Sequence, residues 1–226
     1  MVHLLQQGEW VLFAVIIAAL VISLSFHEFG HAWVAKRFGD NTAERAGRLT
    51  INPRAHIDPM GLLMVIIVGV GYAKPVPTDP RQFTSPYADL LVAAAGPGMN
   101  LLVAAAAINF YTLGLAIAPD IFWQPGPLQF FIILTQINLV LMLFNLLPIG
   151  PLDGHYILPY FLPRRLASFY RFYNHRYGVW LLLLLVFLSF YGVPVFQSIR
   201  GFSCEILETI TLLPLPFDVS RSIFCQ

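Results

Sequence analysis

Long apolar runs separated by short polar linkers dominate the chain. A helix rises 1.5 Å per residue, so about 20 apolar residues are needed to cross roughly 30 Å of hydrocarbon. Four segments reach that length, and we expect each to form a transmembrane helix: residues 10–35, 90–118, 127–147 and 177–199. The pattern predicts an all-α polytopic membrane protein.

A fifth apolar stretch, residues 60–73, is too short for a straight span and contains Gly69 and Gly71. We expect it to dip into the membrane and return. Its β-branched composition favours a β-hairpin element whose free edge can pair with an extended peptide. The alternative is a short helical hairpin in which the glycines allow close packing.

Composition supports the membrane assignment. Of 226 residues, 58% are hydrophobic and 11% are charged, against roughly 25% charged residues in an ordinary soluble domain. The net charge of +1 gives no reason to expect a nucleic-acid partner. The first apolar run follows no basic segment and contains no small-residue cleavage site, so we expect it to remain in the mature protein. We expect one membrane domain, residues 1–200, and an extracytoplasmic tail, residues 201–226.

The basic residues predict the orientation of the spans. Cytoplasmic loops carry an excess of Lys and Arg, and here these residues gather in three linkers: Lys36, Arg37, Arg45, Arg48 and Arg54; Lys74 and Arg81; Arg164, Arg165, Arg171 and Arg176. Residues 118–126 carry no basic side chain. We therefore place the N-terminus and the tail outside. Cys204 and Cys225 then lie in a compartment where either a disulfide or two free thiols is consistent with the sequence.

The sequence HEFGH, residues 27–31, interrupts the first apolar run. Residues four apart share a helix face, so His27 and His31 can bind one Zn²⁺, with Glu28 beside them as the base. A catalytic zinc keeps a position open for water and lowers its pKa to about 7. The alternative is a polar helix end that snorkels to water. Short side chains snorkel poorly, and ionisable groups inside a membrane usually mark function.

Two histidines leave a catalytic zinc one protein ligand short. Asp153 is the candidate, in NLLPIGPLDGH at the end of the third span. Pro148 and Pro151 break the helix there, which exposes backbone that lipid would not tolerate outside a polar cavity. An ordinary Asp-Gly turn is the alternative. Asn145 can donate an N–H to developing negative charge, or it can cap the broken helix.

HEFGH together with NLLPIGPLDGH resembles the site-2 protease family of intramembrane zinc metalloproteases, in its compact bacterial branch. Residues 47–61, 71–83 and 93–104 add to the likeness, which covers about residues 10–160. It implies that His27, His31 and Asp153 hold zinc, that Glu28 is the base, and that Asn145 stabilises the oxyanion. It also implies that Gly69, Val70 and Gly71, which match a G-x-G element of the family, bind substrate. His155 departs from the family pattern and is either a partner of Asp153 or a rival ligand.

The predicted function is therefore an intramembrane zinc endopeptidase that acts on single-span membrane proteins within the lipid bilayer. The resemblance implies a bacterial plasma membrane, and the basic linkers predict that the active site lies toward the cytoplasm. A non-catalytic metal-binding scaffold and a metal transporter are the alternatives. Glu28 favours the enzyme, because metal binding alone needs no base, and the ionisable residues do not recur along several spans as a transport relay requires. The substrate's identity and the oligomeric state stay open.

Overall fold

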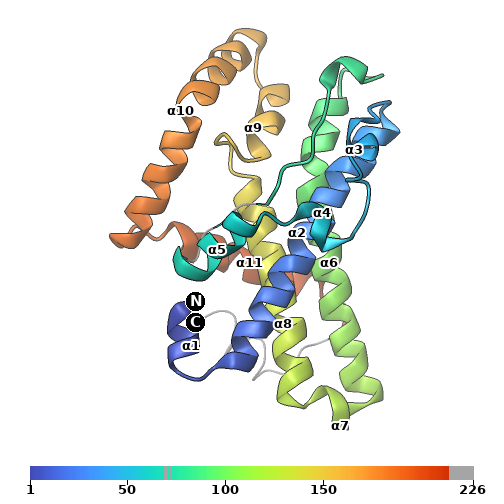
Figure 1. Cartoon of the computed structure of the whole chain (residues 1–226), viewed down its shortest axis with the longest axis vertical. Coiled ribbons are helices and arrows are strands. Elements are labelled where there is room, and N and C mark those ends of the chain that lie inside the picture. The colour runs from blue at the N-terminus through green and yellow to red at the C-terminus, as the bar shows by residue number, and fades with distance from the viewer. Residues whose placement is uncertain (69–70, 72, 214–226) are drawn as a thin grey trace.

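The computed structural model describes residues 1–68, 71 and 73–213, and within these residues the chain forms helices and no strand. Three helices are long and apolar enough to cross a membrane: α2 (Trp10–Arg37), α6 (Ala88–Ile117) and α8 (Pro125–Asn145). They pack against one another at the centre of the molecule (Figure 1). The chain is thus an α-helical, multi-pass membrane protein, and the first three predicted spans are confirmed to within a few residues.

Small side chains let the three helices approach closely. Ala19 of α2, Ala107 of α6 and Leu134 of α8 form one buried cluster. A second cluster lies between α6 and α8 around Ile108 and Leu139. Small residues at such interfaces are typical of helices that associate in lipid, where dispersion packing replaces the hydrophobic effect.

Shorter elements connect and cover this bundle. They are α1 (Val2–Gln6), α3 (Thr42–Arg45), α4 (Pro53–His56), α5 (Pro59–Val68), η1 (Pro80–Gln82), α7 (Pro119–Phe122), α9 (Gly154–Ile157) and η2 (Leu158–Phe161). Residues 73–79, which precede η1, run in extended conformation over one side of α2 (Figure 1).

The predicted β element is not found in the described part of residues 60–73. Residues 59–68 form α5, and Gly71 follows in non-helical conformation. A Cβ on Gly71 would lie 2.3 Å from the Gly61 carbonyl oxygen, so glycine permits a close packing of the segment on itself. This agrees with the close-packing role in the helical alternative. Gly69 and Val70 lie outside the described residues, so their part in substrate binding stays a prediction.

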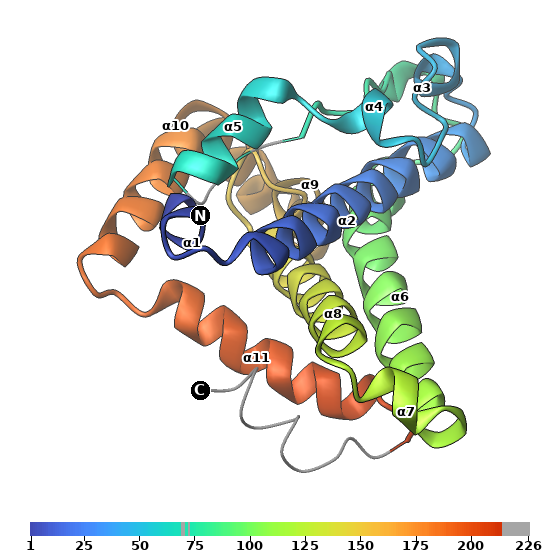
Figure 2. The same ribbon diagram turned by 60° about the horizontal axis from the view of Figure 1, so that its bottom comes forward.

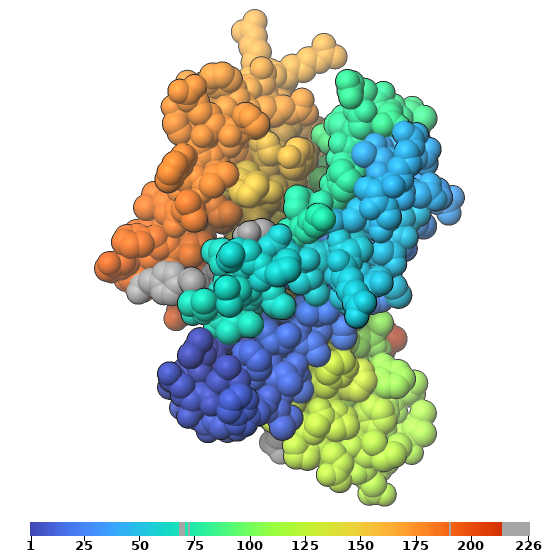
Figure 3. Space-filling model, in the orientation of Figure 1, coloured from blue at the N-terminus to red at the C-terminus, as the bar shows by residue number. Residues whose placement is uncertain are grey.

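A fourth continuous span over residues 177–199 is not confirmed. Helix α10 (Arg164–Phe190) ends before Gly192, whose φ of +95° is left-handed, and α11 (Val195–Ile210) begins after Pro194. Polar and basic residues occupy the first half of α10, which leaves too short an apolar stretch for a span. On the face shown in Figure 3, α10 forms a ridge of its own, separated by a notch from the chain near residue 85.

Helix α11 is amphipathic and lies against α8 (Figure 2). Ile199, Ser203 and Leu207 are its buried residues, and Gln136 Nε2 of α8 donates a 2.7 Å hydrogen bond to Ser203 Oγ. The helix continues past residue 200, the expected boundary of the tail. Cys225 lies outside the described residues, so the pairing of the two cysteines stays open.

Gly30 provides a test of the packing between α2 and α6. A Cβ at this position would lie 2.7 Å from the Ala95 carbonyl oxygen and 2.5 Å from Met99 Cγ. Met99 can move, but the backbone of α6 cannot, so Gly30→Ala should lower the free energy of unfolding by about 1–3 kcal/mol. Thermal unfolding in detergent measures the change. The control is Gly98→Ala, where nothing lies within 4 Å; it should be neutral or stabilising, because alanine is the better helix former.

Candidate metal centre

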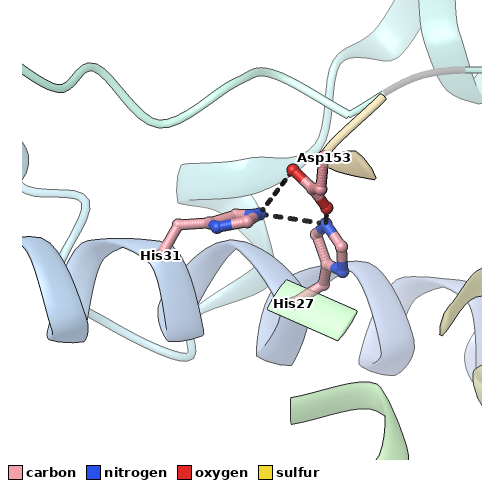
Figure 4. Close-up of side chains that lie close together, drawn as sticks. All are labelled: His27, His31 and Asp153. Atoms are coloured by element: carbon pink, nitrogen blue, oxygen red, sulfur yellow. Dashed lines mark hydrogen bonds and ion pairs between the residues drawn. The ribbon is translucent and has the colours of Figure 1, made fainter. Parts of the chain in front are cut away.

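Three side chains from two distant parts of the chain meet above α2. The Nε2 atoms of His27 and His31 lie 3.1 Å apart. Asp153 reaches them from the loop after α8, with Oδ2 3.2 Å from His27 Nε2 and Oδ1 3.4 Å from His31 Nε2 (Figure 4). The three possible ligand atoms, one from each residue, all lie within 4.8 Å of one another. This is the grouping that the sequence predicted.

The loop between α8 and α9 turns Asp153 back toward the bundle. Two backbone hydrogen bonds between residues close in sequence make the loop compact. The Ile149 N–H donates to Leu147 O and the Leu152 N–H donates to Ile149 O, each at 2.8 Å. A Cβ on Gly154 would lie 2.3 Å from the Leu146 carbonyl oxygen. Glycine after the aspartate therefore allows the loop to close onto the end of α8.

Hydrogen bonds fix the orientation of both imidazoles. His31 Nδ1 lies 2.7 Å from the Val92 carbonyl oxygen, and His27 Nδ1 lies 2.6 Å from Asn100 Oδ1. A carbonyl can only accept, so each Nδ1 is the protonated donor. In a neutral ring, each Nε2 then carries a lone pair directed at the same point.

The orientation of Asn100 is itself determined by its neighbours. Asn100 Nδ2 donates to Ser23 O at 3.2 Å and to Asn138 Oδ1 at 2.8 Å, which leaves Oδ1 to accept from His27. Asn138 Nδ2 donates in turn to Ser23 Oγ at 2.8 Å. Ser23, Asn100 and Asn138 are fully buried. This network joins α2, α6 and α8 directly behind the first histidine.

The donor set fits a zinc ion. Asp153 Oδ2 is buried and has no hydrogen-bond donor among the described residues, and two imidazole lone pairs face it. Two imidazole nitrogens and one carboxylate are a ligand set used by catalytic zinc, with the remaining position left for water or substrate. A partner that holds the other ring nitrogen of each histidine is typical of such sites.

Gly96 makes room for both rings. A Cβ there would lie 2.3 Å from His31 Nε2 and 2.6 Å from His27 Cε1. The imidazole rings occupy the space that a larger side chain at position 96 would fill.

Glu28 lies beside the cluster and is 8% exposed. Its Oε2 accepts a 3.1 Å hydrogen bond from the backbone N–H of Val76, in the extended segment before η1. A cavity of about 700 Å³ exposes Glu28 together with His27, His31 and Asp153 to one common space. The base candidate and the ligand candidates therefore face the same volume.

Asn145 lines this cavity but contacts none of the three ligand candidates. Its Nδ2 donates to the Leu141 carbonyl oxygen at 2.9 Å, one turn back in α8. This bond returns to a carbonyl inside α8 and does not decide between the oxyanion role and helix capping, which both stay predictions. An amide has two N–H groups, so the same side chain keeps one donor for a group bound in the cavity.

His155 is not part of the cluster. Its Nδ1 lies 2.7 Å from Asn174 Nδ2, and its ring packs against Tyr156 and Tyr170. Burial, with the charges of His175 and Arg171, lowers the pKa of the His155 imidazole. The rival-ligand alternative thus finds no support. His56 is also structural: it is fully buried and bonds the Thr50 carbonyl oxygen through Nε2.

Sequence reasoning missed Ser23, Asn138 and the Val76 N–H. The sequence held a weak indication for Ser23 and Asn138, because polar side chains inside apolar spans need hydrogen-bond partners. No signal existed for a backbone N–H.

Comparison with known proteins indicates a family of zinc metalloproteases. The sequence profile of Peptidase family M50 matches residues 15–115 and 113–188. The chain is 44% identical over 153 residues to "Putative zinc metalloprotease YwhC" of Bacillus subtilis, an alignment that covers 66% of this chain and 69% of the relative. It is 36% identical over 151 residues to "Putative zinc metalloprotease Rip2" of Mycolicibacterium smegmatis, covering 63% of this chain and 55% of that one. No solved structure matches significantly.

Removing the partner of His27 should weaken metal binding. Asn100→Ala leaves the ring free to rotate and deprives Nδ1 of its acceptor, and loss of such a partner typically lowers metal affinity by 10–100-fold. Competition with a zinc chelator measures the affinity of the purified protein. The control is Asn109→Ala on the same helix, which bonds Ala105 O and Ile210 O and should leave the zinc affinity unchanged. Equal affinities for the two variants would contradict the assigned role of Asn100.

Proposed function

Because the chain belongs to Peptidase family M50, we propose that it is an intramembrane zinc endopeptidase that hydrolyses peptide bonds in or near the transmembrane segment of single-span membrane proteins. Members of this family use zinc. The observation that carries the proposal is the convergence of His27, His31, Asp153 and Glu28 on one cavity.

His27, His31 and Asp153 would hold the metal through Nε2, Nε2 and a carboxylate oxygen. Zinc, when bound, lowers the pKa of water and polarises a carbonyl group. Glu28 takes the proton from the attacking water and later delivers it to the nitrogen of the leaving amine. The second N–H of Asn145 donates to the negative charge that develops on the scissile carbonyl oxygen.

The cavity suits a substrate that has been unwound. Peptide bonds in a transmembrane helix are shielded and hydrogen-bonded, so the helix must open before water can attack. Gly71, Ala73, Pro75 and Val76 line one side of the cavity, and an extended segment of this kind can pair with an extended substrate. We assign Gly69, Val70 and Gly71 to this contact. The basic linkers favour a site toward the cytoplasm, and the family resemblance favours a bacterial plasma membrane.

A non-catalytic metal-binding scaffold is the second candidate. It would use the same three ligands and would not need an acid or base beside them. The burial of Glu28 with its carboxylate in the cavity favours the enzyme, since burying a carboxylate without a purpose is costly.

Glu28→Gln tests the choice between these two functions. The amide keeps the shape of the side chain but cannot accept a proton, so cleavage should fall at least 100-fold while zinc stays bound. His27→Ala should lose both the zinc and the activity. The assay uses purified protein in detergent and a single-span test helix with a central Gly-Pro pair, which unwinds readily. Elemental analysis gives the zinc content, and equal cleavage by wild type and Glu28→Gln would rule out Glu28 as the base.

Asn145→Ala tests the oxyanion role. Loss of one such donor typically lowers kcat by 10²–10³-fold, with little change in KM or in zinc content. If Asn145 only caps α8, the variant should instead lower the melting temperature and leave kcat near the wild-type value. Steady-state kinetics and thermal unfolding of the same preparation separate the two outcomes.

A further inference from the structure

Arg48 is a buried arginine that pairs with no carboxylate among the described residues. It lies in the linker after α3, is 5% exposed, and takes part in none of the ion pairs found in the described part of the chain. A buried guanidinium is costly unless its hydrogen bonds are made. The hydrogen-bond partners of the Arg48 guanidinium therefore indicate its role.

The partners of Arg48 are backbone carbonyls of the segment that reaches Glu28. Its Nη2 donates to Lys74 O and, at 3.3 Å, to Pro75 O. The Pro75 carbonyl belongs to the same peptide group as the Val76 N–H, and that N–H donates to Glu28 Oε2 at 3.1 Å. One planar peptide unit thus has the arginine at its oxygen and the glutamate at its nitrogen.

The local sequence makes this contact specific. In Lys74-Pro75-Val76-Pro77 the two prolines have no N–H, and the Lys74 N–H is already bonded to His56 O at 2.9 Å. Val76 carries the remaining backbone donor in this stretch. A shift of the segment by one residue in either direction would present a proline nitrogen to Glu28 and leave its Oε2 without this bond.

The far end of the segment is held independently. The Asp79 N–H donates to Oδ2 of the fully buried Asp40 at 2.7 Å. Arg48 is therefore not needed merely to keep the segment attached to the linker after α2. Its distinct effect is to set the position and tilt of the peptide group between residues 75 and 76.

We propose that Arg48 is a positioning residue for the proteolytic reaction: through the Pro75–Val76 peptide group it holds the Val76 N–H against Glu28 Oε2 and so orients the carboxylate toward the cavity. This inference rests on the proposed function, in which Glu28 moves the proton. Fixing one oxygen by the backbone leaves Oε1 as the atom that faces the attacking water. Misorientation of a catalytic group by about 1 Å can cost on the order of 100-fold in rate.

The kinetic test compares Arg48→Met and Arg48→Lys with wild type. Arg48→Met fills similar space without donors, and we expect kcat to fall 10–100-fold while KM and zinc content stay within about twofold of wild type. Arg48→Lys, which can still donate to one carbonyl, should recover part of the loss. The control is Arg81→Met on the same segment, since Arg81 is exposed and binds the Asp79 carboxylate; its kcat should stay at the wild-type value.

A second measurement does not depend on activity. Hydrogen exchange resolved to the Val76 amide should be slow in wild type and at least 10-fold faster in Arg48→Met and in Glu28→Ala, and unchanged in Arg81→Met. Val76→Pro removes the N–H and should reproduce the kcat loss of Arg48→Met, whereas Val76→Ala keeps the N–H and should not.

Wild-type values of kcat and of Val76 exchange in Arg48→Met would overturn the inference and leave the proposed function intact. A loss of kcat in Arg48→Met accompanied by loss of zinc, or not recovered at all in Arg48→Lys, would also overturn it, because Arg48 would then support the fold in general. Equal cleavage by wild type and Glu28→Gln would instead overturn the proposed function. In that case the exchange of the Val76 amide still decides whether Arg48 sets the contact with Glu28.

Discussion

The hydrogen bond between His27 Nδ1 and Asn100 Oδ1 is the contact on which the arrangement of the site depends. Both groups lie inside apolar helices, where a polar atom without a partner is costly and water cannot easily replace a lost bond. Because both Asn100 N–H groups are committed to Ser23 O and Asn138 Oδ1, the amide cannot flip. The ring of His27 is therefore fixed by the packing of three helices, and a shift of any one helix along its axis would break the network.

The convergence of the three candidate ligands could be predicted from the sequence because it depends on local spacing. The interval of four residues sets His27 and His31 on one face of a helix, and Pro148, Pro151 and Gly154 predict a turn that can return Asp153 to the bundle. The supports of these residues could not be predicted in the same way. Whether Asn138 meets Asn100 depends on the relative register of α6 and α8, and the sequence does not encode that register in any local pattern.

The fold followed the apolar pattern where a run was long and uniform, and departed from it elsewhere. The segment MVIIV is rich in β-branched residues, yet Pro59–Val68 is helical, since β propensity mainly reflects packing on a sheet and no neighbouring strand is found in the described chain. In the fourth predicted span, residues 177–199, Gly192 and Pro194 lie in the last third of the apolar run. The local effect of these two residues on the backbone ended α10, although the average hydropathy favoured continuation.

The candidate metal ligands and the proposed base are held by different kinds of structure, and for the proposed function this difference has a chemical consequence. His27 and His31 lie on a spanning helix, and their rings are hydrogen-bonded to α6. Glu28 Oε2 is instead hydrogen-bonded to an extended segment. Arg48 and Asp40, both in the linker after α2, bind that segment. The zinc affinity and the orientation of Glu28 can thus vary independently. A substitution in the linker after α2 would alter the Pro75–Val76 peptide group, and through it Glu28, without moving the imidazoles. The same segment lines the cavity in which an unwound substrate would lie. A substrate that pairs with it would press on the peptide group that orients Glu28, so that substrate binding and alignment of the base become one event.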